Sequence, residues 1–165
     1  MSNASEFAGL ACDHLDDLCT YAAHLVGDAD DALEFVAAGI NHAMRYPPAR
    51  VRVDGRVALL RAVTNACRNE QRFPPRPSGP ARIFRRHRPT LAATAEAVAA
   101  QRINTVKRAL GTLPFDRRAA ILLRDLERLT YRDMARALEC SPEAASRLLA
   151  GARREFGSVY REIAL

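Results

Sequence analysis

The chain has 165 residues, 48% of them apolar, with no tryptophan and abundant alanine and leucine, a composition that favours helices over strands. No stretch approaches the ~18 uninterrupted apolar residues that a membrane span requires, and the opening MSNASEF lacks the features of a signal peptide. We therefore expect an all-α, cytoplasmic protein.

The net charge of +6 is distributed unevenly. Residues 1–46 contain eight acids and one arginine, a net charge of −7, whereas residues 47–90 contain eleven arginines and two acids, a net charge of +9. Residues 91–165 contain thirteen basic and nine acidic residues, a net charge of +4. The arginines from Arg50 to Arg88 should attract phosphate groups. Arginine suits bidentate phosphate contacts, although its almost exclusive use also fits a GC-rich genome.

The first predicted helix runs from about Phe7 to Val26, and Gly27 ends it because glycine adopts the left-handed conformation that often follows a helix. Apolar residues recur every three or four positions, which indicates one face packed against a core. This face consists of Cys12, Leu15, Cys19, Ala22 and Val26.

The same helix contains residue types that bind zinc. A metal site would use Cys12, His14, Cys19 and His24. However, the two cysteines share the apolar face, and the histidines lie off it. We therefore expect buried, unreactive cysteines and no metal. The spacing of all four cysteines does not suggest a disulfide framework.

A second helix should begin at Asp28, whose side chain can cap it, and end at Arg45-Tyr46, because Pro47-Pro48 cannot continue it. Acidic residues near its start complement the helix dipole. Its predicted apolar face consists of Leu33, Val36, Ile40 and Met44.

A third helix should be capped by Asp54 and reach about Arg72. Its inward residues are predicted to be Val57, Leu60, Val63 and Cys67. Its other sides carry polar and basic side chains, at Arg56, Arg61, Asn65, Arg68 and Arg72.

Residues 73–89, FPPRPSGPARIFRRHRP, contain five prolines and follow no regular period, which is typical of a linker. Helical patterns resume at roughly 91–110 and 114–128. The sequence therefore predicts two small helical domains, residues 1–72 and 91–165, joined by a flexible basic linker at residues 73–90. Whether the domains pack together or lie apart stays open, because a proline-rich tether permits both.

Residues 129–156 have the pattern of a helix-turn-helix. Thr130 and Asp133 form a capping box, and Ser141-Pro142-Glu143 is a favourable start for the second helix. The turn usually requires glycine where this chain has Glu139, a difference that costs on the order of 1 kcal/mol. The predicted buried positions are Met134, Ala135, Leu138, Cys140, Ala145 and Leu148.

The outward side of the second helix carries few basic residues in its first half. Ser146 and Arg147 are placed to reach base edges, and Arg153 and Arg154 are better placed for phosphates. A solvated helix face would give much the same pattern at the last two positions.

Two parts of the chain resemble bacterial RNA polymerase sigma factors of the extracytoplasmic-function (ECF) group. The segment LGTLPFDRRAAILLRDLERLTYRDMARALECSPEAASRLLAGARREF resembles region four of these proteins nearly end to end. YAAHLVGDADDALEFVAAGINHAMRY resembles region two less closely, and VALLRAVTNACRNEQRF resembles the helix that follows it. The resemblance covers about four fifths of the chain and omits mainly the linker.

The resemblance implies a protein that binds core RNA polymerase through region two and promoter DNA through both regions, and that is not an enzyme. In region four, the DNA-binding residues would be Arg132, Glu143, Ser146, Arg147, Arg153 and Arg154. In region two they would be Arg61, Asn65 and Arg72. The polymerase-binding residues would be Glu34, Phe35, Ala37, Ala38 and Asn41.

The sequence departs from the family on these surfaces. Ala37 and Ala38 replace a polar pair, and Leu148-Leu149-Ala150-Gly151 replaces a basic run in the recognition helix. Aromatic residues that could stack on flipped bases are limited to Tyr46 and Phe73.

Three interpretations follow, and none involves a cofactor, a membrane or a small-molecule substrate. The first is a working sigma factor, with a possible anti-sigma partner. The second is a degenerate sigma-like protein that binds an anti-sigma factor or another regulator without starting transcription. The third is a DNA-binding regulator that does not engage polymerase. An enzyme is not indicated, because the sequence contains no Gly-rich phosphate loop and no spacing of catalytic residues.

Overall fold

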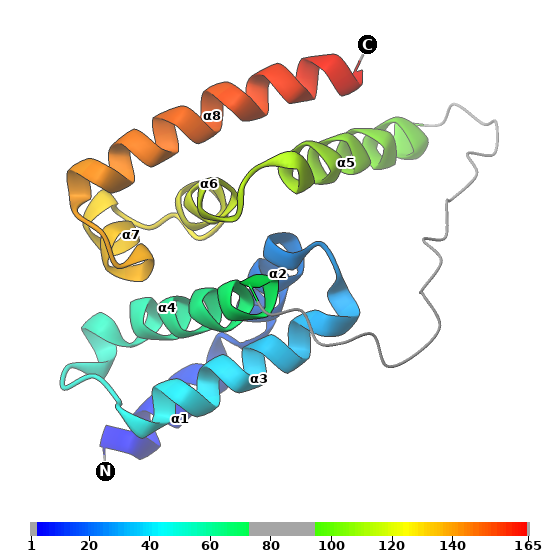
Figure 1. The fold of residues 1–165 in the computed structure, drawn as a ribbon. Helices are drawn as coiled ribbons and strands as arrows, with labels where there is room; N and C mark the ends of the chain where they lie inside the picture. The colour runs from blue at the N-terminus through cyan, green and yellow to red at the C-terminus, as the bar shows by residue number, and fades with distance from the viewer. Residues whose placement is uncertain (1–2, 73–94, 165) are drawn as a thin grey trace.

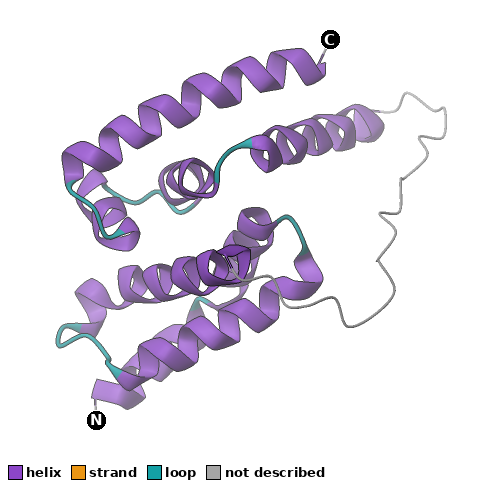
Figure 2. Cartoon of the chain, in the orientation of Figure 1, coloured by secondary structure: helices purple, strands orange, loops and turns teal. Residues whose placement is uncertain are grey.

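The computed structural model describes residues 3–72 and 95–164, with the side chains of residues 70–72 and 95–97 left out. These residues form helices joined by short loops, and none of them lies in a β-strand (Figure 2). The chain is therefore all-α, as predicted. The predicted linker, residues 73–90, lies outside the described residues. None of the described helices has the length and apolar character that crossing a bilayer would require.

The N-terminal unit consists of α1 (Asn3–Asp13), α2 (Leu15–Val26), α3 (Ala29–Arg45) and α4 (Val51–Arg72). In Figure 1 these helices form the lower layer, and α4 and α2 lie nearest the upper layer. The side chain of Asp28 accepts a hydrogen bond from the backbone N–H of Asp30, and Gly27 follows α2 with φ of 86°. The sequence predicted both helix ends correctly, because these local interactions determine them.

α3 and α4 approach each other closely. A Cβ added to Gly39 would lie 2.9 Å from the backbone N and Cα of Val63, so only glycine fits at this crossing. Tyr21 of α2 is fully buried, and its hydroxyl lies 2.8 Å from that of Thr64 on α4. Burial raises the pKa of Tyr21, consistent with a neutral phenol that is bonded within the core.

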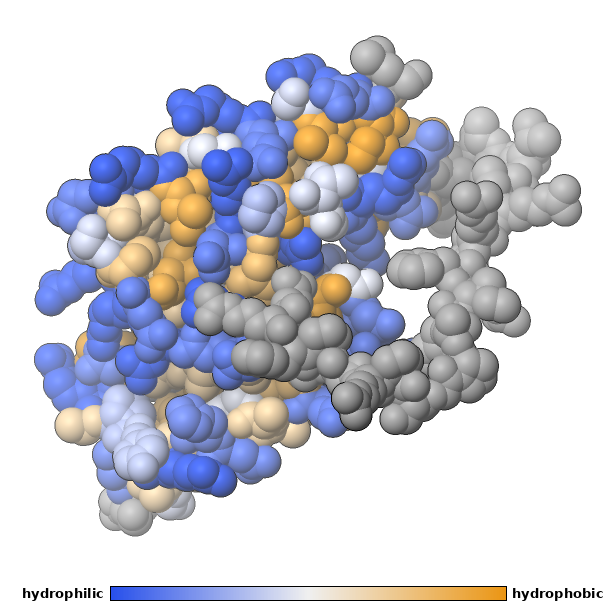
Figure 3. Space-filling model, viewed as in Figure 1, coloured by the Kyte–Doolittle hydropathy of each residue, from blue (hydrophilic) through white to orange (hydrophobic). Residues whose placement is uncertain are grey.

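The C-terminal unit consists of α5 (Ala95–Thr112), α6 (Phe115–Ile121), a π-helical segment η1 (Leu122–Leu126), α7 (Tyr131–Leu138) and α8 (Pro142–Ala164). α8 lies across the upper layer and contacts α5, α6 and α7 (Figure 1). Figure 3 shows apolar residues gathered between α5 and the C-terminal half of α8, where Phe156 stacks on Tyr160.

The two units pack against each other. α4 contacts α7, and α2 contacts α6 and η1, so residues of both units belong to one hydrophobic cluster. The guanidinium of Arg118, which is buried, donates from α6 to the carbonyl oxygen of Leu25 at 2.6 Å. Arg56 of α4 donates to the carboxylate of Glu127 at 2.6 Å. Burial raises the pKa of Glu127, and the charge of Arg56 partly opposes that shift.

The first predicted helix is wrong as a single element. The structure divides it at His14, whose φ of −105° and ψ of 10° are not helical. The break lets α1 and α2 bury different faces against α4, since α1 buries Phe7 and Ala11 whereas α2 buries a separate set. That set is Leu18, Tyr21, Ala22 and Leu25.

Only part of the predicted cysteine face is confirmed: Ala22 is fully buried, and Val26 is partly buried against the core. Cys12 is exposed, Cys19 is half-buried and Leu15 is 38% exposed. Tyr21 is buried, and the side of α2 that faces the core is therefore the one that carries Leu18 and Leu25.

The predicted apolar face of the second helix is wrong at Leu33, whereas Ile40 and Met44 are partly buried against the core. Leu33 is 59% exposed, and the buried residues of α3 include Ala32, Gly39 and Ala43. At Gly39 the close crossing with α4 leaves no room for a larger side chain. Val36 is buried as predicted.

The third helix begins earlier than predicted, at Val51. The carbonyl oxygen of Arg50 accepts hydrogen bonds from the backbone N–H groups of Val53 and Asp54, so Asp54 lies inside the first turn and does not cap the helix. The inward residues were predicted correctly, since Val57, Leu60, Val63 and Cys67 are all buried.

Candidate nucleic-acid interface

α7 and α8 form the predicted helix-turn-helix corner. The backbone N–H of Asp133 donates to the hydroxyl of Thr130 at 3.1 Å, and the backbone N–H of Ala144 donates to that of Ser141 at 3.1 Å. Both helices therefore start where the sequence predicted. Between them Glu139 adopts a left-handed conformation, with φ of 57° and ψ of 44°. The turn keeps its usual shape and accepts the strain of a non-glycine residue.

The inner side of the corner matches the prediction at most positions. Met134, Ala135, Leu138 and Ala145 are buried. Cys140 is exposed, which contradicts the prediction, because the chain turns outward after Glu139. Leu149 is the largest fully buried side chain of α8, whereas Leu148 is only partly buried.

The first half of α8 presents its polar side chains to solvent. Glu143, Ser146 and Arg147 are all exposed, and Ala150 continues the same side. Hydrogen bonds from its own backbone N–H and from Ser141 lower the pKa of Glu143, as expected for a carboxylate at a helix N-terminus. This outward side, defined by Glu143, Ser146 and Arg147 and called the α8 face below, is free to enter a groove of duplex DNA.

Further along α8 the basic residues lie in two different environments. Arg154 is exposed, whereas Arg153 forms an ion pair with Asp125 of η1. Arg132, at the start of α7, is also exposed. The side chains of Arg132 and Arg154 are available to phosphates, and the charge of Arg153 is partly neutralised by its partner.

A basic hollow lies beside the start of α7, and the sequence interpretation missed two of its residues. It has a volume of about 300 Å³ and is lined by Arg124, Asp125, Arg128 and Arg153. Arg124 donates to the carbonyl oxygen of Leu129 at 2.6 Å, and its guanidinium lies 5.1 Å from the centre of the Tyr131 ring.

Arg128 is exposed and adopts a left-handed conformation, with φ of 55°. It forms no hydrogen bond or ion pair with another residue that the structure describes. No pattern in the sequence marks it, because glycine, the usual sign of positive φ, is absent there. An arginine retained in a strained, solvent-facing position beside a helix-turn-helix suits a phosphate contact.

The predicted region-two residues lie on a separate surface. Arg61 and Asn65 are on the side of α4 that faces α7, where the Asn65 amide donates to the Glu139 carboxylate at 3.3 Å. The side-chain oxygen of Asn65 also accepts a hydrogen bond from Arg68 at 2.8 Å. Arg61 is exposed and lines a small pocket with Arg136. The side chain of Arg72 lies outside the described residues.

The predicted polymerase-binding residues lie together on α3. Glu34, Phe35 and Ala38 line a groove of about 470 Å³ between α3 and α4, and Ala37 and Asn41 are exposed on the same helix. The rest of the groove is formed by His42, Ala62, Ala66 and Asn69.

Comparison with protein families supports the assignment of the C-terminal unit. Residues 103–156 match the family model for region 4 of sigma-70, a segment that extends from within α5 to Phe156 of α8 and includes the whole corner. No curated protein matches the chain. Residues 103–156 are therefore similar to the DNA-binding helix-turn-helix region of sigma-70 factors.

Proposed function

We propose that the protein is a sigma factor of the ECF type that binds core RNA polymerase and directs promoter-specific initiation of transcription. In this proposal α8 contacts duplex promoter DNA through Ser146 and Arg147. The N-terminal unit binds the polymerase and contacts the separated strands. The protein acts in the cytoplasm, without a cofactor and without enzymatic activity of its own.

The outward position of the α8 face is the observation that carries this proposal. Ser146 and Arg147 are exposed within the segment that matches sigma-70 region 4. The caps at Thr130 and Ser141 fix where α7 and α8 begin, and in a helix-turn-helix the second of two such helices enters the major groove.

The groove between α3 and α4 has the shape and chemistry of a site for a partner helix. Its lining includes the small side chains of Ala38, Ala62 and Ala66 and the carboxylate of Glu34. A ridge of larger apolar side chains on a polymerase helix would fill such a groove, and Glu34 would attract a basic residue beside it.

A second candidate is supported by the composition of the same surfaces. Ala37 and Ala38 offer no polar contacts, and Leu148-Leu149-Ala150-Gly151 offers no basic residue to the DNA backbone. A sigma-like regulator that binds an anti-sigma factor or another protein through the groove between α3 and α4 would need neither. This candidate requires that the chain bind a protein other than RNA polymerase and that it not initiate transcription.

Co-purification with core RNA polymerase, followed by transcription from candidate promoters, distinguishes the two. The sigma-factor proposal predicts a complex with core and specific transcripts. Ala38→Arg should abolish the complex by filling the groove, whereas Ala4→Arg, on an exposed position of α1, should leave it intact. A chain that fails to bind core but forms a stable complex with another protein would favour the second candidate.

A further inference from the structure

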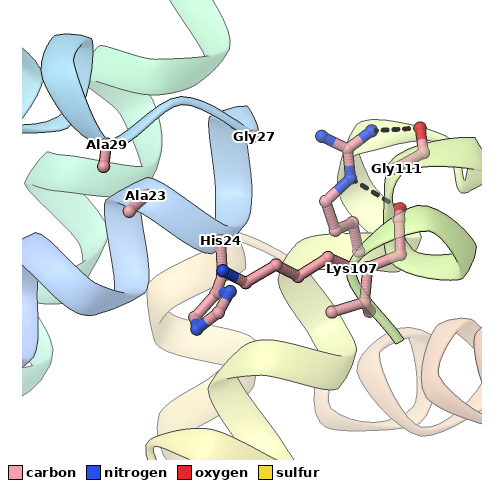
Figure 4. Close-up of a pocket in the computed structure, with 8 residues that line it drawn as sticks. Ala23, His24, Gly27, Ala29, Lys107 and Gly111 are labelled. Atoms are coloured by element: carbon pink, nitrogen blue, oxygen red, sulfur yellow. Dashed lines mark hydrogen bonds between the residues drawn. The ribbon is translucent and has the colours of Figure 1, made fainter. Parts of the chain in front are cut away.

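A small pocket of about 150 Å³ lies where the two units meet, apart from the surfaces described above. The N-terminal unit lines it around Gly27, between α2 and α3, and the C-terminal unit lines it with residues of α5 and α6. Figure 4 shows Lys107 of α5 extending towards His24 of α2 in this pocket. Pockets for drug-sized ligands begin at about 300 Å³, so this one suits a ligand of only a few atoms.

The ionisable side chains that line the pocket are all basic. They are His24, Lys107 and Arg118, and no described aspartate or glutamate lines it with them. Within the described ranges, Lys107 and His24 form no hydrogen bond or ion pair with another residue. Burial lowers the pKa of His24, and the charge of Lys107 lowers it further. The two side chains therefore lie close enough to repel each other when both are protonated.

The positive charge of Arg118 has no acidic partner in the part of the chain that the structure describes. Arg118 is 8% exposed and donates four hydrogen bonds, all to backbone carbonyl oxygens, at 2.6 to 3.1 Å. A guanidinium has five N–H groups, so one N–H on Nη1 is left over. Burial lowers the pKa of Arg118, the direction expected of a cation without a counter-ion.

The nearby groups that would repel an anion already have partners. The carbonyl oxygens of Leu110 and Gly111 accept hydrogen bonds from Arg118. The carboxylate of Asp28, at the start of α3, accepts from the backbone N–H of Asp30 and does not line the pocket. The pocket therefore presents unpartnered donors and a buried positive charge to whatever enters it.

These donors suit a small oxyanion. An ammonium offers three N–H groups and a neutral imidazole one, and a phosphate group has oxygens on every side to accept them. His24 approaches from the N-terminal unit, whereas Lys107 and Arg118 approach from the C-terminal unit. An anion held by all three would link α2 to α5 and α6.

We propose that this pocket binds phosphate, as the free ion or as the phosphate group of a small molecule, with His24, Lys107 and Arg118 as its donors. Binding stabilises the contact between the two units, because the complete donor set exists only where they meet. The site is independent of the proposed function, since it shares no residue with the α8 face or with the groove between α3 and α4.

Titration of the full chain with inorganic phosphate, at fixed pH and with chloride keeping the ionic strength constant, tests the site. The NMR signal of the His24 ring, identified by its loss in His24→Gln, should shift and saturate. Lys107→Gln should weaken phosphate binding roughly three- to tenfold, because it removes one exposed charge-assisted contact. The matched control Arg102→Gln removes the same charge from an exposed position of α5 outside the pocket, and it should weaken binding much less.

Thermal unfolding gives a second readout. Phosphate should raise the melting temperature of the wild type above its value in chloride, and the increase should be smaller in Lys107→Gln than in Arg102→Gln. Glycerol phosphate distinguishes the two sources of the anion. Binding as tight as that of inorganic phosphate would assign the site to phosphomonoesters, and binding of inorganic phosphate alone would assign it to the free ion.

The proposal is overturned if phosphate leaves the His24 signal unmoved, if the shift does not saturate, or if Lys107→Gln and Arg102→Gln weaken binding equally. The assay contains neither polymerase nor DNA, so failure of the protein to bind core would reject the proposed function and leave this result standing.

Discussion

The α8 face and the side of α4 that carries Asn65 and Arg68 have similar side chains and different surroundings. Each offers arginine and a neutral polar residue at helical spacing. Ser146 and Arg147 are open to solvent, whereas Asn65 and Arg68 are bonded to acids of the other unit. Residue type alone therefore does not define a DNA-binding surface in this chain.

The largest expected effect comes from breaking the boundary that separates the two faces. Arg118→Ala should lower the free energy of unfolding by about 3–5 kcal/mol, because it leaves buried carbonyl oxygens without their charged donor. Urea denaturation measures the change. Arg118→Lys should recover only part of it, since an ammonium cannot reach all the carbonyls that the guanidinium fork reaches. A loss under 1 kcal/mol in Arg118→Ala would mean that these bonds do not hold the units together.

The corner that presents the α8 face can be tested through its core. Leu138 is buried where α7 ends, and Leu138→Ala should cost about 2–5 kcal/mol by leaving a cavity. Thermal unfolding of the full chain measures this loss. An unchanged melting temperature would contradict the position of the turn.

Recognition of bases by the α8 face should depend on Arg147. Arg147→Ala should weaken binding to the preferred duplex by roughly 1–3 kcal/mol and binding to random duplex much less. Titrations of both duplexes at one salt concentration give the comparison, and Arg102→Ala, on an exposed position of α5, is the control. Equal losses on both duplexes would make Arg147 a phosphate contact.

Arg128 in the basic hollow gives a further test, because its replacement should affect stability and DNA binding in opposite directions. Arg128→Gly should stabilise the fold by up to about 1 kcal/mol, since glycine adopts positive φ without strain. It should also weaken duplex binding and reduce the salt dependence by about one ion contact. Unfolding curves and a salt series test both parts. Stabilisation without loss of affinity would exclude Arg128 from the interface.

The smallest effect concerns a single proton. Burial lowers the pKa of His24, and the charge of Lys107 from the other unit lowers it further. Because this pKa is depressed in the folded chain, the stability that His24 contributes is present above the unfolded pKa and is lost as pH falls. Lys107→Gln should raise the pKa of His24, which an NMR titration measures. No change would indicate that the units do not meet at this pocket in solution.

The sequence predicted the features that depend on neighbouring residues. Caps at Asp28, Thr130 and Ser141 start helices because each side chain reaches a backbone N–H two or three residues away. Long-range contacts decided the rest. Leu33 is exposed, and the close approach of α3 to α4 at Gly39 is a second feature that the helical period alone does not reveal.

For the candidate site, too, the local features were predictable from the sequence and the long-range contacts were not. The exposure of Ser146 and Arg147 followed from the helix-turn-helix pattern, although their role stays a prediction. The contact between Asn65 and Glu139 joins residues 74 positions apart, and nothing in the sequence indicates it. The strain at Arg128 was likewise not predictable, because it depends on how η1 leads into α7.

Selection of duplexes from a random-sequence pool by the full chain tests most directly whether this protein reads DNA through α8. We predict that the wild type enriches one short motif and that Arg147→Ala loses preference at one position within it. Enrichment of no motif, or of an identical motif by both proteins, would contradict the account.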